Sequence, residues 1–232
     1  MRMEAMTWNE VQNYLKVKNE LIIPVGTCEQ HGKHLPLNND IIIAEYLSDY
    51  LSQQRNIITA PTINYGINLP CDKYMHGTAT LKADILKGMI LSLLEWWELQ
   101  GFRKFYIVTY HGDPVHVETL ADIKENVFLL EPWEIEYGDI LERQQTIKHA
   151  CEAETSVTLY LFPDKVRLDH IEEYDIPIDR FIDYLHHKRG DKIENCVGCL
   201  GFPSSATSEK GRAIVERMKA LILNQYDKFC RI

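Results

Sequence analysis

The feature that most constrains the fold is an alternation of short apolar runs with longer segments of helical periodicity. Residues 21–26 are a brief run of mostly branched aliphatic residues that closes at Gly26, as expected of a strand buried on both faces. Asn39 and Asp40 then provide a helix start, and the apolar residues that follow recur at helical spacing. A strand followed directly by a helix is the unit from which parallel sheets are built.

The alternation continues along the chain. It predicts further strands over residues 57–65, 105–109 and 133–137, and helices over 82–100, 115–128 and 208–226. Repeated right-handed crossovers favour a three-layer α/β/α fold with a mostly parallel central sheet. Residues 164–206 are irregular and mixed in charge, so we expect an excursion or a contact between subunits there. No repeat or linker divides the chain, and we expect residues 1–232 to form a single domain.

Composition excludes several classes of protein. A formal net charge of −9 argues against a nucleic-acid binder, which normally carries a basic face. No apolar run approaches the roughly 18 residues of a membrane span, and residues 1–20 read as a capped helix rather than a signal peptide. The six cysteines are irregularly spread, which indicates a reducing compartment and therefore the cytoplasm.

Carboxylates and imidazoles follow two of the predicted strands. Glu29 and His31 come after the first strand, with Asp40 at the next helix start, and His111 and Asp113 follow the strand at 105–109. Ligands of open α/β sheets bind beyond the carboxyl ends of the strands, so these groups are expected at one rim. The mixture suits zinc or manganese, and a carboxylate shared between two ions would give a binuclear centre. The alternative is that they are ordinary capping and hydrogen-bonding groups.

A third polar cluster occupies residues 149–156. His149 with a nearby carboxylate such as Glu154 could perform general acid–base work, or the segment could simply be a helix start with acidic first-turn residues. Cys151 adds an alternative function, a cysteine-dependent hydrolase in which His149 activates the thiol, although a small buried thiol is the commoner fate. The lone pair Cys196 and Cys199 is expected to be free thiols rather than a zinc site.

Three segments resemble the creatininase (creatinine amidohydrolase) family. They are PVGTCEQHGKHLPLNND at residues 24–40, Tyr65-Gly66 through His76-Gly77-Thr78, and HACEAETS at residues 149–156. The resemblance runs from about residue 20 to 165 and implies a metal-dependent amidohydrolase of that family's fold. A catalytically silent relative that binds a metabolite is the alternative from another class.

The resemblance also implies a ligand set. Carried over by position, the first ion is bound by Glu29, Asp40 and His111, and the second by His31, the bridging Asp40 and either Asp113 or Glu154. The ions would be two divalent metals, zinc and/or manganese, with iron possible. A hydroxide bound at this centre would attack the carbonyl carbon of a C–N bond, and His149 would pass a proton to the leaving nitrogen.

The substrate follows less directly from the resemblance. His34, His76 and Thr78 are the substrate-binding candidates. The chain reads Thr-Tyr-His-Gly-Asp-Pro at 109–114 where the family often has Asn-Gly-His-Gly-Gly-Asn, and Cys151 replaces a usual glycine. These departures argue against creatinine itself and leave a small-molecule amide substrate with a cyclic amide, formamide or peptide-like bond. Family members are often hexamers, which implies a homo-oligomer.

Overall fold

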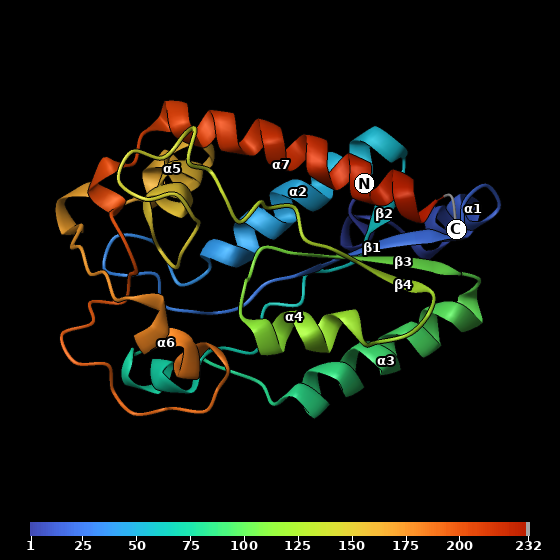
Figure 1. The fold of residues 1–232 in the computed structure, drawn as a ribbon. Helices are drawn as coiled ribbons and strands as arrows, with labels where there is room; N and C mark the ends of the chain where they lie inside the picture. The colour runs from blue at the N-terminus through green and yellow to red at the C-terminus, as the bar shows by residue number, and fades with distance from the viewer. Residues whose placement is uncertain (231–232) are drawn as a thin grey trace.

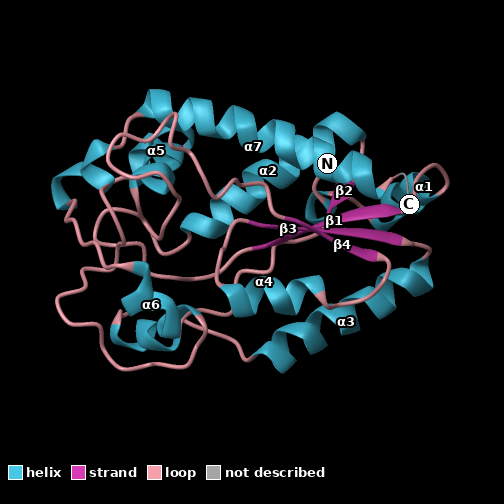
Figure 2. Ribbon diagram, viewed as in Figure 1, coloured by secondary structure: helices cyan, strands magenta, loops and turns pink. Residues whose placement is uncertain are grey.

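The computed structural model describes residues 1–230 as a three-layer α/β/α structure, which confirms the predicted fold class (Figure 1). Its central sheet is parallel, with strand order β2-β1-β3-β4. The strands are β1 (Glu20–Val25), β2 (Ile58–Thr59), β3 (Lys104–Thr109) and β4 (Val127–Leu130). In the register between the two central strands, Leu21 lies opposite Phe105 and Val25 opposite Thr109. The two central strands therefore end together at one rim of the sheet, which Figure 2 shows in outline.

Alternate residues of the strands enter two separate cores. Ile22 and Val108 belong to the core beneath α2 (Asn39–Arg55), α5 (Glu152–Leu161) and α7 (Ser208–Phe229). Leu21 and Ile107 belong to the opposite core, formed with α1 (Trp8–Leu15), α3 (Ala83–Gln100) and α4 (Pro114–Ala121). The two faces of the sheet are covered by different helices (Figure 1). This period-two division is what a strand buried on both faces requires.

Local signals in the sequence explain where several helices begin and end. Thr7 caps α1 in a reciprocal capping box with Glu10, and Thr207 accepts a backbone N–H at the start of α7. Gly101 ends α3 in the left-handed region, at φ 116°. Gly211 serves packing instead, because a Cβ there would lie 1.9 Å from the carbonyl oxygen of Ser156. A glycine is therefore needed for α7 to lie close against α5.

Two predicted elements are wrong. The helix expected over residues 115–128 ends at Ala121, and residues 127–130 form β4 instead. Pairing with β3, in which Phe105 lies opposite Val127, outweighs the helical preference of a short apolar run whose periodicity is ambiguous. Residues 133–137 are not a strand: within the described chain the sheet ends at β4, and only Glu136 forms an isolated bridge, with Thr146. The run at 57–65 contributes only the two residues of β2 to the sheet.

The irregular segment predicted at 164–206 is confirmed as an excursion. It contains short 3-10 turns, η3 (Pro163–Lys165), η4 (Leu168–His170) and η5 (Pro203–Ser205), and one helix, α6 (Ile178–Leu185). That helix packs against η2 (Pro70–Tyr74), where Cys71 meets Phe181 and Tyr184 in a small cluster of its own. Both lie beyond the carboxyl end of the sheet (Figure 1). Across residues 1–230, every helix is too short or too polar to cross a membrane.

Candidate metal centre

Four chain segments meet where the sheet ends. Gly26 brings the end of β1 against the start of α2, since a Cβ there would lie 2.6 Å from Ile41 Cα. The side chain of Asn39, at the start of α2, accepts a hydrogen bond of 2.7 Å from Thr158 in α5. The turn after β3 completes the rim. The carboxylate of Asp40, at the start of α2, therefore lies between the loop that follows β1 and helix α5.

The side chains from these segments form overlapping groups of possible metal ligands. Within each group one ligand atom per residue lies within 4.8 Å of the others. The groups are Glu29, Asp40 and His111; His31, Asp40 and Glu154; and Glu29, His31 and His149. Asp40 is shared by the first two, as expected of a bridging carboxylate. The first two groups match the two ligand sets expected from the sequence, with Glu154 as the third member of the second.

Hydrogen bonds to the protein orient both imidazoles. His111 Nε2 lies 2.7 Å from the carbonyl oxygen of Ile67, and because a carbonyl can only accept, this nitrogen carries the hydrogen. His111 Nδ1 lies 3.1 Å from Glu29 Oε2 and 3.0 Å from Asp40 Oδ2. His31 is held the same way, with Nδ1 donating to the Glu29 carbonyl at 3.1 Å and Nε2 facing Asp40 Oδ1 at 3.0 Å. This is how metal-binding histidines are ordinarily fixed.

Glu154 is positioned by an unusual backbone conformation. The N–H of Ala150 donates to Glu154 Oε2 at 2.5 Å, and Ala150 has a φ of 48°, in the left-handed region that residues with a Cβ rarely adopt. Such strain persists where the surroundings enforce it, often at functional sites. Cys151, which replaces the family's usual glycine, has an ordinary φ of −84°. The replacement therefore costs no backbone strain.

Asp113, the other candidate for the second group, is engaged elsewhere. Its Oδ1 accepts the backbone N–H groups of Val115 and His116 and so caps α4. Its Oδ2 lies 2.7 Å from Nε2 of His187, which reaches in from the excursion. Asp113 joins none of the ligand groups formed by residues 1–230. The geometry thus favours Glu154 over Asp113.

Charges in the cluster shift one another's pKa values strongly. Burial favours the neutral form of Asp40, but His31 and His111 outweigh burial and hold its pKa well below the ordinary range. Burial likewise opposes protonation of His31, yet Asp40 raises its pKa to about 10. Glu154 differs, since burial raises its pKa to about 8 despite the attraction of His31. Asp40 therefore stabilises positive charge placed beside it.

A divalent cation fits this arrangement. Glu29 Oε2 and Asp40 Oδ2 are buried, and apart from His111 Nδ1, at 3.1 Å and 3.0 Å, the described chain offers neither oxygen a hydrogen-bond partner. A buried, unpaired carboxylate oxygen is costly, and a cation between these atoms would satisfy both oxygens and the imidazole nitrogen together. Carboxylate and imidazole are ligands suited to zinc and manganese.

His149 stands at the edge of this cluster. Its Nε2 lies 2.7 Å from the carbonyl oxygen of Gln30 and so carries the hydrogen, while Nδ1 lies 3.9 Å from Glu29 Oε1. Burial lowers the pKa of His149, which favours the neutral imidazole. Its side chain is 22% exposed, against 4% for Glu29 and 1% for His31. His149 is therefore the most accessible of the three side chains in its group.

The cysteine-dependent alternative is wrong on this geometry. Cys151 is fully buried in the core beneath α5 and α7. Burial and then Glu154 raise the pKa of its thiol to about 11, which disfavours the thiolate that a nucleophile needs. Its sulfur accepts the backbone N–H of Lys148 at 3.3 Å. Cys196 and Cys199 form no disulfide, and the absence of zinc at this pair stays a prediction.

The substrate-binding candidates lie in different surroundings. His34 is fully buried, with Nε2 2.8 Å from the hydroxyl of Thr155. Thr78 accepts the backbone N–H of Gln30 at 2.9 Å and so supports the loop between Glu29 and His31. His76 is exposed. No ligand group of the described chain includes any of the three, and their contact with substrate stays a prediction.

Four residues of this region were missed by reasoning from the sequence. His187, from the excursion, contacts buried Asp113. His116 packs against the ring of His111 at 4.9 Å, and its Nδ1 accepts the backbone N–H of Ile67. Gln30 lies inside the first motif and could have been found there. Asp72 carries no sequence signal, because only the folded chain brings it near Gln30.

Comparison with known proteins gives consistent matches over nearly the whole chain. The family model described as Creatininase: Creatinine amidohydrolase matches residues 4–225. The chain is 24% identical to a 3-dehydro-scyllo-inosose hydrolase of Thermotoga maritima, over 97% of this chain and 84% of the relative. It is also 24% identical to creatinine amidohydrolase of Pseudomonas putida, over 91% and 90%. A mycofactocin precursor peptide peptidase of Mycolicibacterium smegmatis is 29% identical, over 85% and 80%.

The fold has a close counterpart among solved structures. A structure described as Creatininase Mn superposes with a TM-score of 0.76 at 22% identity, covering 96% of both chains. The three relatives are named for an inosose, for creatinine and for a precursor peptide. The names of these relatives thus refer to three different compounds.

Proposed function

The chain belongs to the creatininase family, and from this premise we propose that it is a metal-dependent hydrolase of a C–N bond in a small amide. The observation that carries the proposal is the pair of ligand groups that share Asp40, in which Glu29 Oε2 and Asp40 Oδ2 are buried without hydrogen-bond partners. The bond would be a cyclic amide, a formamide or a peptide-like link.

The residues that would hold two divalent ions are the members of these two groups. One ion would be held by Glu29, Asp40 and His111, and the other by His31, Asp40 and Glu154. Zinc and manganese suit this set, and iron is compatible with it. Bound there, the ions would supply Lewis-acid activation of water and of the carbonyl group. Asp113 is assigned to capping α4 and contacting His187.

The chain's own contribution to the reaction is proton transfer and orientation. Hydrolysis joins a water oxygen to the carbonyl carbon, breaks the C–N bond and requires a proton on the departing nitrogen. His149 is neutral by burial, partly exposed, and has Nδ1 free because Nε2 donates to the Gln30 carbonyl. We assign to Nδ1 the task of taking the proton from water and delivering it to nitrogen. Burial of the ligand side chains keeps bulk water from competing for them.

The decisive experiment is metal analysis combined with turnover. Wild-type protein and Asp40→Ala, both purified without added metal, would be compared by elemental analysis and screened against cyclic amides, formamides and short peptides. We expect about two ions per chain in the wild type, loss of both in the variant and turnover only in the wild type. A variant that keeps metal and activity would overturn the proposal. Metal without turnover in the wild type would leave the silent relative as the better description.

We further propose a cytoplasmic homo-oligomer. All six cysteines are free, which suits a reducing compartment. The outer face of α3 exposes Ile85, Trp96 and Leu99, at 53%, 66% and 77% relative accessibility, and an exposed apolar patch is typical of an interaction surface. Light scattering of the wild type and of Trp96→Glu tests this, since a smaller particle in the variant is expected and a monomeric wild type contradicts it.

A further inference from the structure

Three buried carboxylate oxygens near the metal centre have no hydrogen-bond partner. They are Glu29 Oε2, Asp40 Oδ2 and Asp72 Oδ2. The first two belong to the ligand groups, but Asp72 belongs to none of the groups among residues 1–230. A cation at the metal centre therefore accounts for two of the three oxygens. The third needs another partner.

Asp72 lies close to His149, at the edge of the cluster of metal-ligand candidates. It sits in η2, is 6% exposed, and its Oδ1 accepts a hydrogen bond of 3.3 Å from Gln30 Nε2. Gln30 Oε1 accepts the backbone N–H of Gly32, which fixes the orientation of the amide. The same Nε2 lies 2.9 Å from His149 Nε2. One amide group thus separates Asp72 from His149.

The surroundings of Asp72 disfavour an isolated negative charge. Burial, and after it the charge of Glu29, raises the pKa of Asp72 to about 7. Within the described part of the chain, no ammonium or guanidinium group satisfies Oδ2. A buried carboxylate oxygen without a hydrogen-bond partner is costly. A donor carried by the substrate fits, because it would arrive only with the molecule to be cleaved.

We propose that Asp72 is a substrate-recognition residue whose free oxygen binds a protonated nitrogen beside the scissile bond, in an amidinium, guanidinium or ammonium group. The assignment rests on the proposed function and adds the substrate class to it. Charge-assisted hydrogen bonds to a carboxylate are about twice as strong as neutral ones, and a planar amidinium offers two parallel N–H donors. Neutral amides of the same shape lack the charge and should bind less well.

The test uses two probes of nearly equal shape, acetamidinium and acetamide. Metal-loaded wild type, Asp72→Asn and Asp84→Asn would each be titrated with both probes by ligand-observed NMR, with metal content measured alongside. The Asp72→Asn side chain would keep an acceptor for Gln30 but lose the charge, whereas Asp84 is an exposed aspartate of α3 and serves as the matched control. We expect wild type and the control to bind acetamidinium at least about tenfold more tightly than acetamide, and Asp72→Asn to lose that preference with its metal content unchanged.

Each other outcome has a defined meaning. Equal binding of the two probes by wild type overturns the proposal without need of any variant, as does a preference that survives in Asp72→Asn. Loss of metal in Asp72→Asn would instead make Asp72 part of the metal site and likewise overturn the recognition role. If wild type prefers acetamidinium but hydrolyses no C–N substrate, the proposed function fails while the assignment of Asp72 stands.

Discussion

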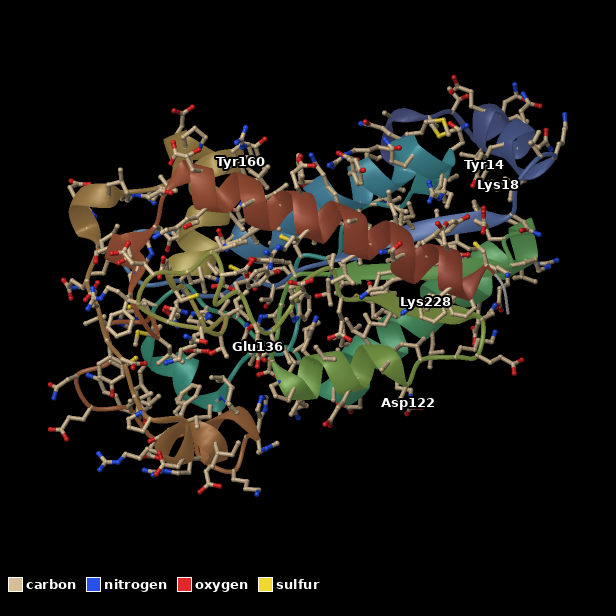
Figure 3. All side chains as sticks on the ribbon, turned by 45° about the horizontal axis from the view of Figure 1, so that its top comes forward. Tyr14, Lys18, Asp122, Glu136, Tyr160 and Lys228 are labelled. Atoms are coloured by element: carbon tan, nitrogen blue, oxygen red, sulfur yellow. The ribbon has the colours of Figure 1, made fainter. Side chains whose placement is uncertain are left out.

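The two ends of strand β1 each carry a glutamate, and the two glutamates have opposite surroundings. At the amino end, Glu20 accepts hydrogen bonds from the hydroxyls of Tyr106 at 2.9 Å and Tyr226 at 3.3 Å, and Lys18 lies 3.2 Å from Oε2. Figure 3 shows Lys18 in this region, beside Tyr14. Beyond the carboxyl end, Glu29 faces the imidazoles of His111 and His149, and one of its oxygens has no hydrogen-bond partner.

The difference separates a structural carboxylate from a functional one. Glu20 is surrounded by hydroxyl and ammonium donors that belong to the chain, so its charge is satisfied once the protein has folded. Glu29 shares its surroundings with Asp40, whose Oδ2 is also unpartnered. Folding alone leaves this site incomplete, and burial of an unsatisfied carboxylate is costly. We infer that the carboxyl end depends on a bound cation and the amino end does not.

Removal of metal should have the largest effect on activity and stability, and it should act only at the carboxyl end of β1. Treatment with a chelator followed by dialysis is expected to abolish hydrolysis. It should also lower the free energy of unfolding by about 4 kcal/mol, if the free ion had exceeded its dissociation constant a thousandfold. Urea unfolding of treated and untreated protein, followed by tryptophan fluorescence, measures the second effect. Identical urea midpoints for treated and untreated protein would contradict this, because they would show that the carboxylates at the carboxyl end need no cation.

Substitution of the two candidate acidic ligands should sharpen the assignment within the carboxyl end. Glu154→Gln is expected to lose one of the two ions and at least about 100-fold in activity, because a direct ligand should matter no less than the outer-shell partners of metal sites. Asp113→Asn is the matched control and should retain both ions, since Asp113 caps α4 and contacts His187. Elemental analysis of both variants decides. The reverse result would return the ligand role to Asp113.

How much of this could be read from the sequence also differs between parts of the molecule. Glu29, His31 and Asp40 lie in one short motif at a strand end and a helix start, so local rules were enough to group them. The parallel sheet followed from alternating apolar runs, because burial on both faces leaves a strong local signal. β4 was missed because the run at Val127–Leu130 is too short for its periodicity to separate a strand from a helix end.

Contacts between distant segments were beyond local rules. Asp72 reaches Gln30 across 42 positions of sequence, and His187 reaches Asp113 across 74. Neither pair has a spacing that a strand or a helix would impose. The choice between Asp113 and Glu154 is of the same kind, since it depends on what else each carboxylate contacts. Fold class and the first motif therefore came from local patterns, whereas the contacts between distant segments came from the folded chain.

Loss of His116 should weaken metal binding without removing it. His116 is fully buried beside the ring of His111, and its Nδ1 accepts the N–H of Ile67 while the carbonyl of Ile67 accepts from His111. The backbone of Ile67 therefore holds both imidazole rings. His116→Ala is expected to lower metal affinity about 10- to 100-fold, the usual range for an outer-shell partner. Competition with a fluorescent chelator measures this, and Leu120→Ala, a buried truncation in the same helix, controls for loss of packing.

Unchanged metal affinity in His116→Ala would make the residue a packing element only. Reduced affinity in both variants would mean that general loosening of α4 is responsible. The positioning role is supported when His116→Ala alone loses affinity while the two variants are destabilised by similar amounts.

The smallest effect is expected at the amino end. Glu20→Gln keeps the shape of the side chain but removes the charge that Tyr106, Tyr226 and Lys18 share, so we expect a loss of about 1–2 kcal/mol in the free energy of unfolding. Both ions should be retained, because the change lies at the far end of β1 from Glu29. Glu95→Gln, on the exposed face of α3, is the control and should change stability little. If Glu20→Gln released metal, the two ends would be coupled and the contrast between a structural and a functional carboxylate would fail.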